Sequence, residues 1–203
     1  MSFFERNRRE LAELGIDPGR LPPGQYHTRR FPVLHVGPVP DYDLRTWNLR
    51  VFGAVEREHT FSWDELRALP ATSVVTDIHC VTKWSKFDTP WTGVRFRDLF
   101  DLVGVREDAR HVVLHAEYGY TTNVPLEAAC RDASLVAYEY DGQPLAPEHG
   151  FPARALIPHL YFWKSAKWLR GIELTVEDRP GFWEQNGYHN VADPFLEQRF
   201  SDD

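Results

Sequence analysis

Hydrophobic and polar residues are arranged along this chain in short segments that suit strands and short helices. Residues 47–55 alternate between the two kinds, and residues 72–79 are rich in β-forming side chains, so both segments are predicted to be strands. Further predicted strands cover residues 111–116, 135–140, 153–157 and 171–176. Asp141-Gly142 is a strong turn signal directly after the strand at residues 135–140.

Signals for helix starts and stops lie between these strands. Ser62-Trp63-Asp64-Glu65 fits a capping box, and Pro70 ends the helix that follows it. The predicted helices cover residues 4–14, 63–69, 94–103 and 125–131. Because strands and short helices interleave irregularly, we expect an α+β protein with a single mixed α/β domain over residues 31–203. Residues 1–30 are expected to form an N-terminal extension.

The composition narrows the classes of function. The chain has 203 residues with 42% hydrophobic residues, enough for a sizeable core, and its seven tryptophans favour an aromatic-lined pocket. The net charge of −7 argues against nucleic acid as a partner. No apolar run is long enough to span a bilayer, and no secretory signal is found, so we expect a cytoplasmic protein.

Cys80 is the residue with the clearest chemical potential. It stands where a predicted strand breaks into a polar, aromatic loop, Val81-Thr82-Lys83-Trp84-Ser85. The other cysteine, Cys130, lies in a predicted helix and is expected to be structural, so Cys80 has no partner at disulfide or zinc-finger spacing. A single thiolate can hold a soft metal whose other ligands come from a cofactor. Composition alone favours the alternative of a buried, inert cysteine.

Three more segments carry polar and aromatic residues typical of sites. They are residues 149–154, 161–168 and 183–190. With the Cys80 segment they resemble, in order and spacing, the sulfite-oxidase-like molybdopterin oxidoreductases. The Cys-x-x-x-Trp-Ser sequence at Cys80 is similar to the branch that includes the catalytic subunit of periplasmic methionine sulfoxide reductase. The resemblance covers about residues 31–199.

The resemblance implies a fold of the sulfite oxidase molybdopterin-binding type, and a Mo-molybdopterin cofactor without haem. Tungsten suits the same ligands. Cys80 matches the family's metal ligand, and Tyr188 matches the active-site tyrosine near the metal, so both are expected to be catalytic. The residues expected to bind the cofactor are His35, His149, Arg154, Ser165, Ala166 and Lys167. Cationic groups and backbone amides suit the anionic phosphate of such a cofactor. Weaker pocket candidates are Lys83, Trp84, Tyr118, Tyr120, Thr121, Thr122 and Asn123.

Two departures from the family bear on the substrate. Ser85 and Leu34 stand where sulfite oxidases carry arginines that grip an oxyanion. We therefore expect oxygen-atom transfer on a small sulfoxide or N-oxide rather than on sulfite. Electrons are expected to pass through a separate partner or carrier.

Other interpretations stay open at this point. A non-redox module could use the same fold to bind the cofactor, another anion or a protein partner. A cysteine hydrolase would use Cys80 as nucleophile, with His115 or His149 as base. A zinc site from His79, Cys80 and His115 is less favoured, because the spacing fits no structural zinc pattern.

Overall fold

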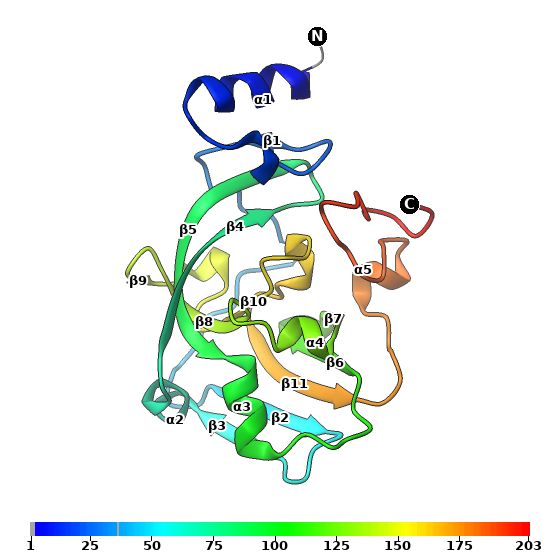
Figure 1. The fold of residues 1–203 in the computed structure, drawn as a ribbon. Helices are drawn as coiled ribbons and strands as arrows, with labels where there is room; N and C mark the ends of the chain where they lie inside the picture. Colours follow the sequence, from blue (N-terminus) through cyan, green and yellow to red (C-terminus); the bar gives the residue numbers. More distant parts are fainter. Residues whose placement is uncertain (1–2, 36) are drawn as a thin grey trace.

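The chain forms two β-sheets, with short helices and loops packed around them (Figure 1). The computed structural model describes residues 3–35 and 37–203. The first sheet has the strand order β1 (Tyr26–His27), β5 (Trp84–Arg95), β8 (Leu135–Tyr140) and β10 (Arg154–Leu156). In the same sheet, β4 (Thr72–His79) pairs with β5, and β9 (Gln143–Pro144) pairs with β8. The second sheet has the order β3 (His59–Ser62), β2 (Asn48–Gly53), β11 (Leu169–Thr175), β6 (His111–Ala116) and β7 (Thr121–Pro125).

Short helices connect the strands and cover the sheets. The α-helices are α1 (Phe3–Glu13), α2 (Trp63–Ala68), α3 (Phe96–Val103), α4 (Leu126–Ala129) and α5 (Phe182–Gln185). The 3₁₀-helices are η1 (Pro18–Arg20), η2 (Glu117–Gly119), η3 (Pro147–His149) and η4 (Phe162–Lys164). This arrangement confirms the α+β, mixed-sheet prediction. No helix in the two described ranges is both long and apolar enough to cross a membrane.

Local signals account for several element boundaries. The capping box at α2 is present: Ser62 N donates to Glu65 Oε2 at 2.7 Å, and Glu65 N donates to Ser62 Oγ at 3.3 Å. α3 ends at Gly104, as predicted, and its Phe96, Leu99 and Phe100 are buried. These side chains join a core cluster that includes Leu114 and Ile172 of the second sheet. Helix and sheet thus share one hydrophobic core.

Some predictions of element type were wrong. The expected loop at Trp84-Ser85 is the start of the long strand β5, and Val94 belongs to that strand rather than to the following helix. β5 pairs with β4 on one side and β8 on the other, and these non-local partners override the charged residues and the proline in its sequence. Residues 121–125 form the edge strand β7, which was not among the predicted strands. The helix expected over 125–131 is shortened to α4.

The N-terminal segment packs on the first sheet. β1 runs parallel to the start of β5, with Tyr26 opposite Trp84. Leu11 and Leu21 form a small buried cluster with Phe87 of β5. Figure 1 shows α1 at the end of the molecule opposite the second sheet, above β1 and one end of β5. Residues 3–27 therefore extend the sheet that carries Cys80.

Candidate active site

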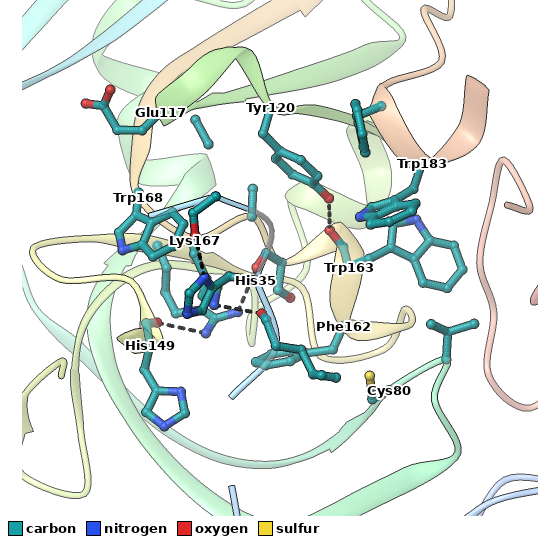
Figure 2. Close-up of a pocket in the computed structure, with 18 of the residues that line it drawn as sticks. His35, Cys80, Glu117, Tyr120, His149, Phe162, Trp163, Lys167, Trp168 and Trp183 are labelled. Atoms are coloured by element: carbon teal, nitrogen blue, oxygen red, sulfur yellow. Dashed lines mark hydrogen bonds between the residues drawn. The ribbon is translucent and has the colours of Figure 1, made fainter. Parts of the chain in front are cut away.

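One pocket gathers the eight residues predicted to be catalytic or to bind the cofactor. It has a volume of about 620 Å³, and its lining includes Cys80, Tyr188, His35, His149, Arg154, Ser165, Ala166 and Lys167. Figure 2 shows Cys80, Trp163 and Trp183 at one side of this pocket, and His149, Lys167 and Trp168 at the other. We refer to these as the thiol end and the cationic end. The residues that the resemblance implied thus line the same pocket, and their roles stay predictions.

Cys80 lies in a tight turn between β4 and β5. Its backbone N–H donates to Trp84 O at 2.9 Å, and Lys83 N donates to Cys80 O at 2.9 Å. The side chain is 8% exposed, and Thr82 Oγ1 donates to Sγ at 3.1 Å. Burial raises the pKa of this thiol. The turn therefore holds the sulfur at the pocket wall with one hydrogen-bond donor beside it.

Arg154 and Lys167 form the cationic end. Arg154 is 2% exposed; its Nη1 donates to His149 O at 2.9 Å and its Nη2 to Ser165 O at 2.7 Å. Lys167 Nζ donates to Leu34 O at 2.8 Å and to Glu148 O at 2.9 Å. Burial lowers the pKa of Arg154 to about 9, and burial with the nearby Arg154 charge lowers that of Lys167 to about 7.

The close packing of the cationic end depends on Gly150. Its φ is +111°, and a Cβ there would lie 3.0 Å from Arg154 Cβ and 3.2 Å from Lys167 Cβ. A larger residue would thus be strained and would push the two cations apart. Within the described residues, neither Arg154 nor Lys167 forms an ion pair with a carboxylate. A buried and a half-buried cation without counter-charges suit an anionic ligand.

The other predicted cofactor residues surround these cations. The ring of His149 stacks on Phe31 with centroids 3.9 Å apart, and burial followed by the Arg154 charge lowers its pKa to about 4. His149 is therefore neutral near pH 7. The Ser165 hydroxyl accepts a hydrogen bond from Ile157 N at 2.8 Å, and Ala166 O accepts one from Ala155 N at 2.8 Å. The ring of His35 meets the edge of Trp168 at 5.6 Å.

Three aromatic side chains, Trp163, Trp183 and Tyr188, line the thiol end, and we call them the aromatic wall. Tyr188 stacks on Trp183 with centroids 4.9 Å apart and meets Trp163 edge-on at 5.0 Å. Burial, and then the nearby Cys80, raise the pKa of Tyr188. Its phenol is thus a neutral donor near pH 7.

Sequence reasoning missed some lining residues and included others that lie elsewhere. Phe31, Trp163 and Trp183 line the pocket but were not singled out, although the last two stand in the segments that carried the resemblance. Trp84, Tyr118 and Tyr120 line it as expected. The described lining does not include the weaker candidates Lys83, Thr121, Thr122 and Asn123.

The geometry also bears on the alternative chemistries. His115 Nε2 lies 2.8 Å from Glu173 Oε2 on the second sheet, and His115 is not part of the described pocket lining. His149 does line the pocket, but its ring is stacked on Phe31. Among the described residues, no group of three or more His, Cys, Asp or Glu side chains could hold a metal ion. Neither a Cys80–His115 nucleophile pair nor the zinc site is supported.

Comparisons with known proteins agree with this arrangement. Residues 36–183 match the family described as oxidoreductase molybdopterin binding domain. The chain is 54% identical over 184 residues to the uncharacterized oxidoreductase YuiH of Bacillus subtilis, covering 90% of this chain and 93% of that protein. It is 32% identical over 180 residues to the putative protein-methionine-sulfoxide reductase subunit YedZ1 of Azospira oryzae, covering 86% of this chain and 68% of that protein. The sulfane dehydrogenase SoxCD of Paracoccus pantotrophus has a similar fold, with a TM-score of 0.64 and 18% identity over 73% of this chain and 42% of its own.

Proposed function

The chain belongs to the family of oxidoreductases with a molybdopterin-binding domain, and we propose that it reduces a small, neutral sulfoxide or N-oxide at a molybdenum or tungsten held by molybdopterin. The observation that carries this proposal is one pocket that joins the Cys80 thiol to the buried Arg154 and the half-buried Lys167. For a sulfoxide the balanced reaction is R₂SO + 2 H⁺ + 2 e⁻ → R₂S + H₂O. A separate electron carrier supplies the electrons.

The residues present fit the cofactor at both ends of the pocket. The cationic end offers a buried guanidinium and a half-buried amine without carboxylate partners among the described residues, which suits the phosphate of the pterin. The thiol end offers one sulfur, which suits a soft metal once it is deprotonated. When bound, the cofactor supplies two-electron oxygen-atom transfer.

The protein's own residues would bind, orient and donate protons. Arg154 and Lys167 would hold the phosphate, and Cys80 would contribute its sulfur to the metal. Tyr188 Oη, which stays protonated near pH 7, would donate a hydrogen bond or a proton to the oxygen that leaves the substrate. His149, neutral and stacked on Phe31, would hydrogen-bond the pterin through its ring nitrogens.

The thiol end supports a neutral substrate rather than sulfite. Residues that line the pocket there include Val81, Thr82 and the aromatic wall. Ser85, where sulfite oxidases carry an arginine, is 0% exposed, and its hydroxyl is engaged with His79 Nδ1 at 2.8 Å. Leu34, at the other such position, is 54% exposed. A sulfite-like dianion would find no guanidinium at these positions.

The direct test is turnover by holoenzyme. With a reduced viologen dye as electron donor, we expect oxidation of the dye on addition of dimethyl sulfoxide, methionine sulfoxide or trimethylamine N-oxide. With sulfite as substrate and ferricyanide as acceptor, we expect kcat/KM at least about a hundredfold lower, because a bidentate guanidinium contact to the anion is missing. Rapid sulfite oxidation without reduction of any sulfoxide or N-oxide would overturn the proposal.

A further inference from the structure

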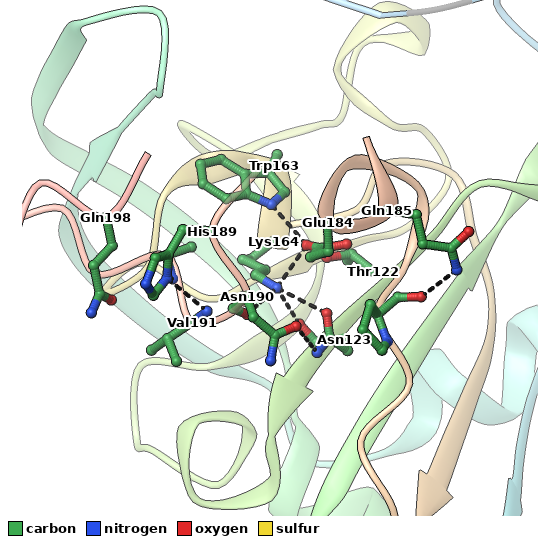
Figure 3. A network of polar contacts seen from close by, with 12 residues as sticks. Thr122, Asn123, Trp163, Lys164, Glu184, Gln185, His189, Asn190, Val191 and Gln198 are labelled. Atoms are coloured by element: carbon green, nitrogen blue, oxygen red, sulfur yellow. Dashed lines mark hydrogen bonds and ion pairs between the residues drawn. The ribbon is translucent and has the colours of Figure 1, made fainter. Parts of the chain in front are cut away.

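A fully buried ion pair lies behind the aromatic wall. Lys164 Nζ is 2.6 Å from Glu184 Oε1, and the two side chains are 0% and 1% exposed. Lys164 belongs to η4 and Glu184 to α5, so the pair joins two segments that are distant in the sequence. Figure 3 shows the pair at the centre of a network of polar contacts.

Both members of the pair have several further hydrogen bonds. Lys164 Nζ donates to Asn123 O at 2.8 Å, Asn123 Oδ1 at 3.0 Å and Asn190 O at 2.7 Å. Glu184 Oε1 accepts from Thr122 Oγ1 at 2.8 Å and from Trp163 Nε1 at 2.8 Å. The network thereby ties η4, β7 and the C-terminal segment together.

The network acts directly on the aromatic wall. Trp163 donates its indole N–H to Glu184, and Trp183 precedes Glu184 in α5. Tyr188 stacks on Trp183, and Lys164 holds the nearby Asn190 carbonyl. Trp163 is thus bonded to the pair directly, whereas Trp183 and Tyr188 are linked to it through α5 and through their stacking on each other.

A gain in folding stability does not explain why a charged pair is buried behind the aromatic wall. Burying an ion pair costs so much desolvation that well-packed apolar residues are often as stable or more stable. A charged pair instead fixes directions, because each hydrogen bond to it has a preferred geometry. Aromatic rings at the thiol end form favourable contacts with sulfur and with apolar substituents.

Resting on the proposed sulfoxide or N-oxide reduction, we propose that Lys164 and Glu184 are positioning residues. They hold Trp163, Trp183 and Tyr188 in the one arrangement that selects substrates with an apolar or aromatic substituent on the reacting sulfur or nitrogen. The substrate class is thus a neutral, aryl- or alkyl-substituted sulfoxide or N-oxide, and the wall is its specificity surface.

The test compares two substrates in Lys164→Met, Glu184→Gln and the double variant K164M/E184L. We expect KM for methyl phenyl sulfoxide to rise roughly tenfold more than KM for dimethyl sulfoxide, since the lost contact is an aromatic pair. Metal content should stay near wild type. kcat should fall by a similar factor for both substrates, because the wall also positions Tyr188, the expected proton donor. Glu58→Gln, at the exposed Arg50–Glu58 pair, is the matched control and should shift neither KM.

A second readout needs no turnover. In cofactor-free protein, acrylamide should quench tryptophan fluorescence more strongly in each Lys164 or Glu184 variant than in wild type, because the wall indoles become mobile. If wild type reduces neither sulfoxide, the proposed function fails, and quenching alone then decides the positioning role. A folded double variant with wild-type quenching, or with a wild-type KM ratio, would overturn the inference. The double variant is chosen because it leaves no unpaired buried charge.

Discussion

Lys167 and Arg154 lie together at one end of the pocket, where burial and then the guanidinium of Arg154 lower the pKa of Lys167 to about 7. Both cations donate to backbone carbonyls, and neither has a carboxylate partner within the described residues. Bringing two like charges together without counter-ions costs free energy unless an anion binds between them. The relationship indicates a ligand phosphate at this end.

Anion binding by the cofactor-free protein should depend on pH through Lys167. An anion binds the protonated amine, so affinity should be constant below pH 7 and fall by up to about tenfold per pH unit above it. Sulfate is the probe, because it does not titrate in this range, and calorimetry from pH 6 to 9 is the measurement. Lys167→Arg should bind sulfate with little change over the same range. A flat profile in the wild type would contradict the assignment.

Arg154→Lys should weaken cofactor retention. The planar guanidinium donates to three carbonyls and stacks on Phe162 at 4.3 Å, and an ammonium cannot reproduce that geometry. We expect roughly a ten- to hundredfold loss of affinity, measured as pterin released on dialysis. Arg67→Lys is the control, since Arg67 stacks on Tyr138 at 4.0 Å at the surface. Equal pterin retention in both variants would argue against a role for Arg154.

Tyr188→Phe should leave the aromatic wall in place but remove the hydroxyl that donates the proton. We expect kcat to fall roughly a hundredfold with metal and pterin content unchanged, because only the hydroxyl is removed. Steady-state kinetics and elemental analysis of the same sample separate the two effects. Tyr140→Phe, at a partly buried tyrosine of β8, should keep wild-type kcat. If Tyr188→Phe also keeps it, the tyrosine is a packing residue.

Gly181→Ala should displace α5 and with it Trp183. A Cβ at Gly181 would overlap the Thr121 carbonyl oxygen and Thr122 Cα, which are backbone atoms of β7 that cannot turn away. We expect a loss of about 1–3 kcal/mol in the free energy of unfolding, measured in urea. At Gly19 the contacts of an added Cβ are with the flexible side chain of Asp17, so Gly19→Ala should cost less. Equal stability of the two variants would show that α5 can shift freely.

Strands were predicted correctly where the hydrophobic pattern of the sequence agrees with the strand pairing in the structure. Residues 72–79, 111–116 and 135–140 are strands with the expected bounds. β5 was not predicted as a strand at all, because Lys86, Asp88 and Pro90 interrupt its pattern and its stability comes from partners on both sides. Local patterns carry no information about such non-local pairing.

The candidate site, like the fold, was predicted only in part. The residues predicted to be catalytic or to bind the cofactor all line one pocket. They were predicted because the motifs that contain them stand in the order typical of the family. Of the aromatic wall only Tyr188 was predicted, and Trp163 and Trp183 were missed. Trp163 is held there by its hydrogen bond to Glu184. That contact arises from tertiary packing, and the local sequence around the two residues that form it gives no sign of it.

The most direct test of the central claim is the metal content of wild type and Cys80→Ser, each purified from a host that makes molybdopterin. We expect near-stoichiometric molybdenum or tungsten in the wild type, and an inactive Cys80→Ser protein that has lost the metal or one metal–sulfur contact in its X-ray absorption spectrum. A folded wild type without either metal, or a Cys80→Ser variant with full activity and an unchanged metal spectrum, would contradict the account.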